Sequence, residues 1–323
     1  MAIPFVPRID DTPRGTVQRV HPLVERVIAE NPSKFTYHGT GTYIVGTRDV
    51  VVIDPGPVID AHRDAIAGAL RGRTVVAIAV THCHSDHSPL AAWLHGHTGA
   101  PRVAIGPHRV IEGWTEDDDF DPDEEVDDDA ATEAKPDDAE ERETIDLAFA
   151  PDVAVRDGDV VARTAEFTMR AVATPGHTSN HMCLAVDEDA MLFSGDHVMG
   201  WSTTVVAPPD GDMADYIASL HKVRGRGDRV LWPTHGGPVT DPGPFLDAYL
   251  AHRLERERRI LEQVRLGNDT IPGIVKVLYA DVDRRLHRPA RRSVWSHLRK
   301  LHAEGAVVPE DGEGRLLGRW GAV

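Results

Sequence analysis

Residues 81–87 read THCHSDH and follow directly on VVAIAV, residues 75–80, the longest purely apolar run of the chain. That run has the length and the β-branched content of a buried strand. On a bent loop that leaves a strand, side chains two positions apart point the same way, as His82 and His84 would. Imidazole and carboxylate groups are ligands that zinc and similar divalent ions prefer. The spacing therefore predicts a metal site at the end of a strand.

Three later segments have the same form, with a polar side chain at the end of an apolar strand. They are TPGH at 174–177, SGD at 194–196 and PTHG at 233–236. Small residues beside each polar side chain let the backbone turn sharply and approach a metal closely. The candidate metal ligands are thus His82, His84, Asp86, His87, His177, Asp196 and His235.

The order of strand and helix patterns favours an α/β layer architecture. Strands are expected at 40–45, 50–54, 75–80, 102–105, 159–162, 166–173, 182–186, 190–194 and 229–231. Helices are expected at 60–71, 89–97 and 213–223, with Asp60 as the capping residue of the first.

The negative charge of the chain is concentrated in one segment. The 323 residues carry a formal net charge of −17, and residues 116–146 contain 18 acidic residues against Lys135 and Arg142. The segment lacks periodicity and large apolar residues, which predicts a solvated surface insertion. A lid or a partner-binding segment is the alternative. The rest of the chain is close to neutral, so the total charge excludes little about the substrate.

The sequence pattern of the last quarter of the chain is mainly helical. Helices are expected at 242–265, 271–279 and 291–304, and the end of the chain has the pattern of a short hairpin with a Gly-rich turn. Helices followed by a hairpin favour a winged helix, so we expect a catalytic domain over 1–252 and a winged-helix domain over 253–323. Residues 284–300 hold seven basic residues and no acidic one. This basic helix predicts either nucleic-acid contact or an ordinary packed or dimerising helix.

The ligand series resembles that of the metallo-β-lactamase-fold superfamily. The family motif H-x-H-x-D-H matches His82, His84, Asp86 and His87, and its later single ligands match His177, Asp196 and His235. The resemblance covers about residues 35–240, and the C-terminal region resembles the winged-helix domain of the lactamase-like subgroup. It implies an αββα sandwich followed by a small winged-helix domain.

The same resemblance assigns roles to the candidate residues. It implies that His82, His84 and His177 hold one metal ion, that Asp86, His87 and His235 hold a second, and that Asp196 bridges the two. Two divalent ions are expected, with zinc favoured over manganese and iron. Asp54 in the VIDPG turn matches a supporting residue, and His38–Tyr43 would edge the site. His181 and His197 adjoin ligand segments, and each is a candidate for supporting a ligand or touching the substrate.

The chemistry that follows is hydrolysis by a metal-activated water, because two metal ions lower the pKa of a shared water towards neutrality. Asp86 could orient that water and carry its proton, which makes it the candidate catalytic residue. The substrate is expected to be an ester, a thioester or a phosphodiester, as in glyoxalase-II-like or endoribonuclease-like enzymes. The resemblance also implies that Asp86 and Asp196 together disfavour antibiotic hydrolysis. The alternatives are a mononuclear iron sulfur dioxygenase and a non-catalytic nucleic-acid-binding module.

Composition adds expectations about compartment and partners. The chain has two cysteines, no apolar run of membrane-spanning length and no visible secretory signal, so a cytoplasmic protein that contacts no membrane is expected. Cys83 should point away from the ligands, and Cys183 should lie in the core. The expected partner is a small-molecule ester or thioester, or single-stranded RNA through the basic helix. An oligomer is compatible with the sequence.

Overall fold

The computed structural model describes residues 3–6, 13–108, 144–281 and 287–323. Their contacts divide the chain into two compact units, and the division falls within one long helix, after Glu255. The first unit contains Met1–Val110, Thr144–Val206 and Asp210–Glu255, and the second contains Arg256–Val323. Of the predicted acidic insertion, only Thr144–Asp146 belongs to the described residues, and residues 284–286 of the basic segment also lie outside them.

Among the described residues, the first unit is built from two sheets and four helices. Its strands are β1 (Val17–His21), β2 (Val24–Ile28), β3 (Gly41–Val45), β4 (Asp49–Ile53), β5 (Thr74–Ala79), β6 (Arg102–Ala104), β7 (Val153–Ala154), β8 (Val160–Arg163), β9 (Thr168–Ala173), β10 (Met182–Val186), β11 (Met191–Gly195) and β12 (Val230–Pro233). Its helices are α1 (Asp60–Ala69), α2 (Leu90–Thr98), α4 (Met213–Arg226) and the first part of α5 (Pro242–Arg265).

The direction of the strands decides where the unit can hold a site. Strands β1 to β7 form one sheet in sequence order, and the second sheet has the order β12-β11-β10-β9-β8. Strands β4 and β5 are parallel, as are β11 and β12. Strand β9 is antiparallel to β10, which is antiparallel to β11, so β9 runs in the same direction as β11. Within each sheet, these strands therefore end at the same edge.

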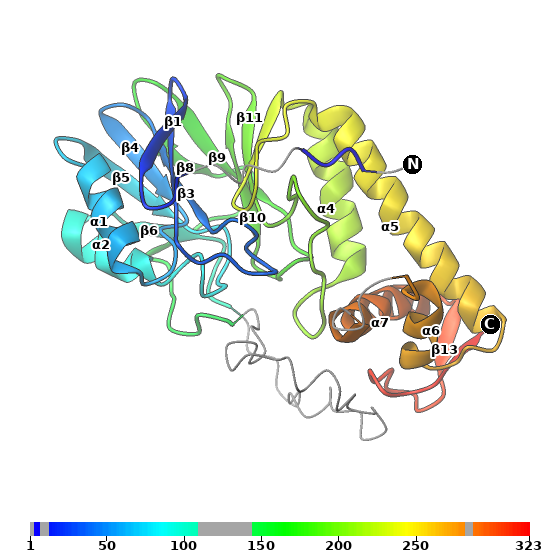
Figure 1. Cartoon of the computed structure of the whole chain (residues 1–323). Coiled ribbons are helices and arrows are strands. Elements are labelled where there is room, and N and C mark those ends of the chain that lie inside the picture. The colour runs from blue at the N-terminus through cyan, green and yellow to red at the C-terminus, as the bar shows by residue number, and fades with distance from the viewer. Residues whose placement is uncertain (1–2, 7–12, 109–143, 282–286) are drawn as a thin grey trace. The chain divides into compact units, whose positions relative to one another are not determined.

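Strand β10 shows how the layers pack. Its Met182, Leu184 and Val186 join the apolar core shared with the first sheet, whereas Cys183 and Ala185 join the core that includes residues of α4 and α5. Alternate side chains of a strand point to opposite faces, so each face of the second sheet is covered by a different layer. Helices α1 and α2 lie against the outer face of the first sheet (Figure 1). The predicted αββα sandwich is confirmed.

Three strands were not predicted, namely β1, β2 and β7. Strand β2 reads VERVI, and its Glu25 and Arg26 are 7% and 6% exposed. Glu25 is compensated by Arg19 and Arg73, whose guanidinium groups lie 2.5 Å and 2.6 Å from its carboxylate. These partners come from other segments of the chain. The charged residues of β2 therefore gave no sign in the sequence that the strand is fully buried. The predicted cap was also wrong, because Asp60 is the first residue of α1 and makes no capping hydrogen bond.

The second unit has the helices and the hairpin expected of a winged helix. It contains α6 (Ile271–Leu278), α7 (His287–Ala303) and the antiparallel pair β13 (Val307–Pro309) and β14 (Trp320–Ala322). Thr270 caps α6 by accepting a hydrogen bond from the backbone N–H of Gly273. Ile274, Leu298 and Trp320 are almost fully buried in one core. Within the part of the chain that is described, no helix is long and apolar enough to cross a bilayer.

Glu257, in the second half of α5, holds the basic helix α7 in place. Its carboxylate oxygens lie 3.2 Å from His297 Nδ1 and 2.8 Å from Lys300 Nζ. Burial raises the pKa of Glu257, but the hydrogen bonds from His297 and Lys300 outweigh it and hold that pKa below its usual value. Lys300 also contacts Glu304 at 2.8 Å. Part of the basic charge of α7 is therefore engaged inside the unit.

We expect Glu257→Gln to destabilise the second unit by roughly 1–3 kcal/mol at pH 7, the usual cost of a lost charge-assisted hydrogen bond. Because the folded pKa is depressed, the ionised carboxylate stabilises the fold above its unfolded pKa of about 4.3, and this is lost as the pH falls through the folded pKa. Calorimetry of the full chain should therefore show a difference from wild type that shrinks below about pH 4. Glu304→Gln, which changes the more exposed partner of Lys300, is the control. An equal effect of both variants would contradict this role of Glu257.

Candidate metal centre

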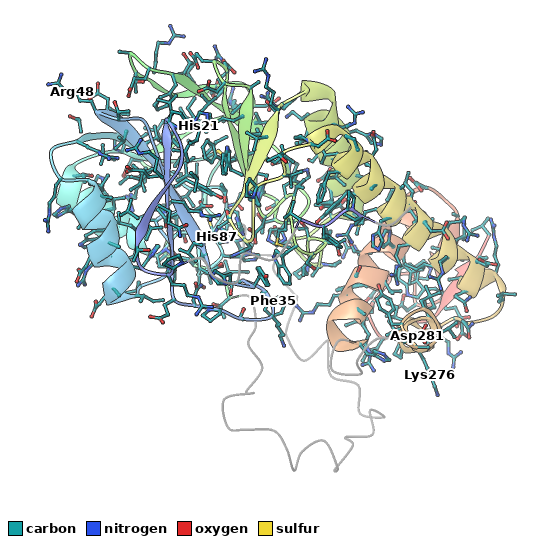
Figure 2. The ribbon with its side chains drawn as sticks, turned by 45° about the horizontal axis from the view of Figure 1, so that its top comes forward. His21, Phe35, Arg48, His87, Lys276 and Asp281 are labelled. Atoms are coloured by element: carbon teal, nitrogen blue, oxygen red, sulfur yellow. The ribbon has the colours of Figure 1, made fainter. Side chains whose placement is uncertain are left out.

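The polar segments predicted from the sequence meet at the ends of the strands. Asp54 follows β4, the motif at 81–87 follows β5, His177 follows the end of β9, Asp196 follows β11 and His235 follows β12. In Figure 2, His87 lies at this edge of the strands, whereas Arg48, which precedes β4, lies at the opposite edge. The polar side chains form three overlapping groups, and within each group the candidate ligand atoms lie within 4.8 Å of one another. They are His82 with His84 and His177, His82 with His87 and Asp196, and Asp86 with His87 and His235.

The first group consists of three buried imidazoles. His84 Nδ1 lies 2.9 Å from His82 Nε2 and 3.1 Å from His177 Nε2. Burial lowers the pKa of His82 well below its usual value and that of His84 to about 3. Both rings are therefore neutral at pH 7 and carry a lone pair, as a metal ligand must.

The second group combines two imidazoles with carboxylates. Asp86 Oδ2 lies 3.3 Å from His87 Nε2 and 3.2 Å from His235 Nε2. Asp196 Oδ2 lies 3.3 Å from His235 Nε2 and 3.7 Å from His87 Nε2, and it reaches the first group at 4.0 Å from His177 Nε2. Burial lowers the pKa of His235, but Asp196 and Asp86 raise it more, to about 10. The two carboxylates thus favour a positive charge at this place, either a proton or a metal ion.

The hydrogen bonds of the rings show that these groups fit a metal ion. His177 Nδ1 lies 2.6 Å from the carbonyl oxygen of Val205, and His235 Nδ1 lies 3.3 Å from that of Gly39. A carbonyl can only accept, so Nδ1 of each ring carries a proton and Nε2 faces the centre, where a metal ion would take the place of any proton on Nε2. Buried His87 Nε2 lies 3.3 Å from Asp86 Oδ2 but forms no hydrogen bond of suitable geometry among the described residues. Ring nitrogens at 2.0–2.1 Å from a tetrahedral ion would stand roughly 3.4 Å apart, close to the spacing observed.

Asp54 supports this centre without belonging to any of the three groups. Its Oδ1 accepts the backbone N–H of Thr81 at 2.8 Å. Its Oδ2 accepts from Thr81 Oγ1 at 2.8 Å, from His87 Nδ1 at 3.0 Å and from Thr234 Oγ1 at 3.2 Å. The residue has a φ of 47°, a conformation that Asp and Asn tolerate better than most residues. One buried carboxylate therefore joins the loops after β4, β5 and β12 and orients His87.

The segment at 38–43 edges the site. Thr40 Oγ1 donates to Asp86 Oδ2 at 2.8 Å, and it accepts from Asn31 Nδ2 at 2.9 Å. The backbone N–H of Thr40 returns a hydrogen bond to Asn31 Oδ1 at 2.9 Å. The reciprocal pair holds the Thr40 hydroxyl in a single direction, so it orients the carboxylate of Asp86.

The remaining sequence candidates lie around the centre. His181 and His197 are buried and belong to none of the three groups, and the ring of His197 packs against Tyr216 at a centroid distance of 4.9 Å. Cys83 is buried, and its sulfur accepts from Asn180 Nδ2 at 3.0 Å. Burial raises the pKa of Cys83 to about 11, so its thiol stays protonated and unreactive.

The end of the predicted acidic insertion reaches the motif itself. The backbone N–H of Ser85 donates to the carbonyl oxygen of Thr144 at 2.8 Å, and the N–H of Asp146 donates to that of Cys83 at 2.7 Å. Ser88 Oγ donates to Asp146 Oδ2 at 2.7 Å. Residues 144–146 thus form a short paired edge along the loop that carries His84.

Threonine hydroxyls are functional groups that the sequence reasoning missed. Thr81, Thr174 and Thr234 each stand one to three residues before a candidate ligand, and each hydrogen-bonds a buried polar group of the centre. The signal was present in the sequence, because three of the four ligand segments contain a threonine one to three residues before their first candidate ligand. The hydroxyl directions became assignable only once the partners from other strands were known.

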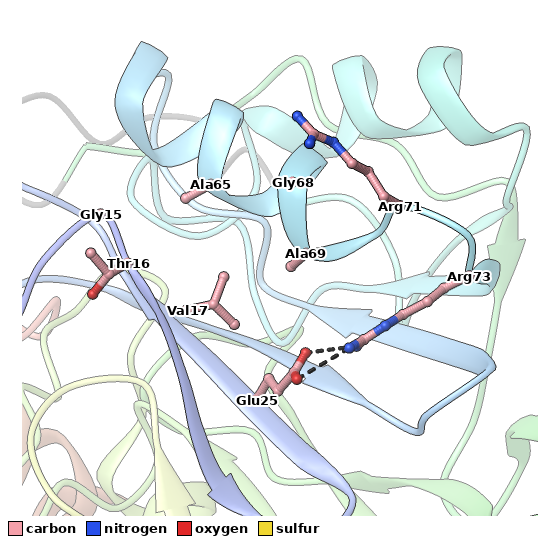
Figure 3. A pocket seen from close by; sticks show the side chains of 9 residues that line it. All are labelled: Gly15, Thr16, Val17, Glu25, Ala65, Gly68, Ala69, Arg71 and Arg73. Atoms are coloured by element: carbon pink, nitrogen blue, oxygen red, sulfur yellow. Dashed lines mark hydrogen bonds and ion pairs between the residues drawn. The ribbon is translucent and has the colours of Figure 1, made fainter.

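A surface pocket between β1 and α1 is separate from this centre (Figure 3). None of its lining residues belongs to the three groups. Its Glu25 is held by Arg73 through two contacts of 2.6 Å and 3.1 Å. The charges of Glu25 and Arg73 are therefore paired with each other.

Comparison with known proteins places this geometry in a family. The family profile described as "Metallo-beta-lactamase superfamily" matches residues 37–235, and that of the "Beta-lactamase associated winged helix domain" matches residues 270–320. The chain is 29% identical over 279 residues to a protein of Aspergillus chevalieri named "Atrochrysone carboxyl ACP thioesterase", which covers 85% of this chain and 76% of the relative. It is 30% identical over 304 residues to the "Beta-lactamase-like protein 2 homolog" of Drosophila melanogaster, covering 90% and 91%.

A solved structure agrees over nearly the whole chain. A beta-lactamase domain protein from Burkholderia ambifaria superposes with a TM-score of 0.70 at 22% identity, covering 97% of this chain and 96% of the other. At that identity the likeness concerns the fold alone. It extends through both units, including the predicted winged helix.

Proposed function

Because the chain belongs to the metallo-β-lactamase superfamily and has its associated winged-helix domain, we propose that it is a dinuclear-metal thioester hydrolase. The hydrolase class itself is confirmed, since the relatives over most of the chain include proteins named as thioesterases. The observation that carries the finer proposal is the convergence of seven candidate ligands into overlapping groups. A thioester is favoured over the other expected substrates because of those relatives' names.

In this proposal, His82, His84 and His177 hold one ion, and Asp86, His87 and His235 hold the other. Asp196 lies between them, within 4.0 Å of His177 and 3.3 Å of His235. Zinc suits the mixture of imidazole and carboxylate groups, with manganese and iron as alternatives. When bound, such ions supply Lewis acidity and lower the pKa of water.

Asp86 is the residue proposed to handle the proton. Its Oδ2 is oriented by Thr40 Oγ1 at 2.8 Å, so the carboxylate has a defined direction at the edge of the centre. In thioester hydrolysis, the oxygen of water attacks the carbonyl carbon, the C–S bond breaks, and a carboxylic acid and a thiol form. Asp86 would accept the proton of the attacking water and return it to the leaving sulfur. Thiolates leave readily, so no further acid is required.

The test of this function is a substrate screen of metal-replete protein, with metal content measured on the same sample. We expect about two ions per chain and release of free thiol from acyl thioesters of coenzyme A and pantetheine. The matched control substrate is the oxygen ester of the same acyl group. Removal of metal by a chelator should abolish thiol release, and added zinc should restore it. Cleavage of single-stranded RNA without thiol release, or one iron with oxygen uptake, would contradict the proposal.

The basic helix α7 provides a separate prediction about nucleic acid. Arg299 stacks over the ring of Trp295 at 5.6 Å, and Lys300 is paired with Glu257, so part of its charge serves packing. We expect the triple variant of Arg291, Arg292 and Arg299 to alanine to keep thioester kcat/KM within about twofold. Fluorescence anisotropy with single-stranded RNA at low and high salt provides the second readout. A loss of salt-dependent RNA binding in this variant, with no thioester hydrolysis by the wild-type protein, would instead favour the nucleic-acid alternative.

A further inference from the structure

We propose that His181 is a positioning residue that holds the backbone of Asp196 through a closed series of hydrogen bonds, with the imidazole proton fixed on Nδ1. The inference deepens the proposed function and rests on it, since Asp196 is the carboxylate proposed to lie between the two metal ions. His181 itself belongs to none of the three ligand groups. It is 1% exposed, and its ring centroid lies 5.2 Å from that of His82.

The donor and the acceptor of each hydrogen bond in the series can be assigned by starting from Asp196. The backbone N–H of Asp196 lies 3.2 Å from His181 Nε2. A backbone N–H can only donate, so Nε2 must carry a lone pair. The proton of the neutral ring is then on Nδ1, which lies 2.8 Å from Thr174 Oγ1 and donates to it.

The same direction follows independently from the other end. Cys183 Sγ lies 3.5 Å from the carbonyl oxygen of Ser194, which can only accept, so the thiol hydrogen points there. Thr174 Oγ1 lies 3.3 Å from Cys183 Sγ, and its hydroxyl hydrogen therefore points to the sulfur. The threonine oxygen is left to accept from His181 Nδ1. Both ends require the same tautomer, and no link has two donors or two acceptors.

The series begins and ends on either side of one glycine. It starts at Asp196, directly after β11, passes through His181, Thr174 and Cys183, and returns to β11 at Ser194. Gly195 lies between the two ends with a φ of 52°, and a Cβ there would lie 2.6 Å from His181 Nε2. The ring therefore sits directly against the turn that presents Asp196.

The other polar backbone atom of Asp196 is held as well. Its carbonyl oxygen accepts from Thr204 Oγ1 at 2.7 Å. With the N–H bound to His181 and the C=O bound to Thr204, the peptide groups on both sides of Asp196 are fixed. Supporting groups of this kind tune metal affinity without touching the metal. Losing the acceptor at Nε2 would leave the Asp196 N–H unpaired in a buried place.

The tautomer can be tested directly in the wild-type protein. A two-bond 1H–15N correlation spectrum of the full chain, labelled at histidine, distinguishes a ring protonated at Nδ1 from one protonated at Nε2. The His181 signals are assigned by their absence from the spectrum of a His181 variant. We expect the proton on Nδ1 both with and without zinc. A proton on Nε2 would overturn the proposal, whatever the variants do.

Two variants of nearly matched size separate positioning from packing. In His181→Gln, the side-chain oxygen can take the place of Nε2 and accept from the Asp196 N–H. In His181→Asn, the amide nitrogen can take the place of Nδ1 and donate to Thr174, but no acceptor reaches Asp196. Competition with a chromogenic chelator should show zinc affinity reduced about 10- to 100-fold in the Asn variant. The Gln variant should stay within about threefold of wild type.

A role in packing alone would weaken zinc binding equally in the two variants, since both remove the ring, and that result would overturn the proposal. Unchanged zinc affinity in the Asn variant would overturn it too. If the Asn variant does not fold, the wild-type spectrum together with the affinity of the Gln variant decides. If wild-type protein bound no metal while the tautomer was as expected, the proposed function would fail and the hydrogen-bond series would stand.

Discussion

His84→Ala is expected to lower kcat/KM for thioester hydrolysis by roughly 10³-fold or more, because Lewis-acid stabilisation of the transition state is worth several kcal/mol. His84 Nδ1 lies in the middle of the first group, 2.9 Å from His82 Nε2 and 3.1 Å from His177 Nε2. Its removal leaves that group with two nitrogens and a space where the third stood. The measurements are the release of free thiol and the metal content of the purified variant.

His221→Ala is the matched control for this change. His221 is an exposed histidine of α4 that belongs to none of the three groups. We expect wild-type metal content and turnover from it, which would show that loss of an imidazole elsewhere has no effect. Wild-type turnover by the His84 variant would refute the assignment of the site.

Asp54→Asn is expected to have the second large effect, although it changes a residue outside the three groups. The carboxylate accepts from Thr81, Thr234 and His87, and both of its oxygens are engaged. An amide has only one oxygen, so either orientation of Asn turns an N–H towards groups that donate. We expect metal affinity to fall by about 10- to 100-fold, as for other groups that orient a ligand. The unfolding free energy should fall by about 3–5 kcal/mol, as for one partner lost from a buried pair.

Metal titration and urea unfolding measure these two consequences separately. Asp60→Asn is the control, because Asp60 makes an exposed ion pair with Arg63 on the surface of α1. Exposed pairs of this kind contribute little to stability, so this variant should remain close to wild type in both measurements. Wild-type metal affinity in the Asp54 variant would show that His87 needs no such orientation.

The strands and helices of the first unit were predictable where their buried residues form a simple apolar pattern. Residues 75–80 were expected as a strand and 213–223 as a helix, and the structure has β5 at Thr74–Ala79 and α4 at Met213–Arg226. Strand β2 was not predicted because the charge of its buried Glu25 is neutralised by Arg19 and Arg73. The local sequence pattern does not show that these residues pair. Local patterns report burial only when the buried side chains are apolar.

The candidate ligands were found from spacing, and the supporting groups were not. His82 and His84 are two residues apart at the end of an apolar run, which is a local property of the chain. Thr40 and Asp86 are 46 residues apart, and Thr234 and Asp54 are 180 apart, yet each pair is joined by a hydrogen bond. Such pairings depend on the order of strands in the sheets.

The sequence by itself determined the family, the layered fold and the residues able to hold metal, since covalent spacing and strand periodicity are local. Only the tertiary structure decided which partner each ring nitrogen meets. His177 and His235 are fixed by carbonyl groups of Val205 and Gly39, and His181 is fixed by Asp196. The hydrogen bond made by one nitrogen of an imidazole determines which of the two nitrogens carries the proton. The partner in that hydrogen bond is brought into place by folding.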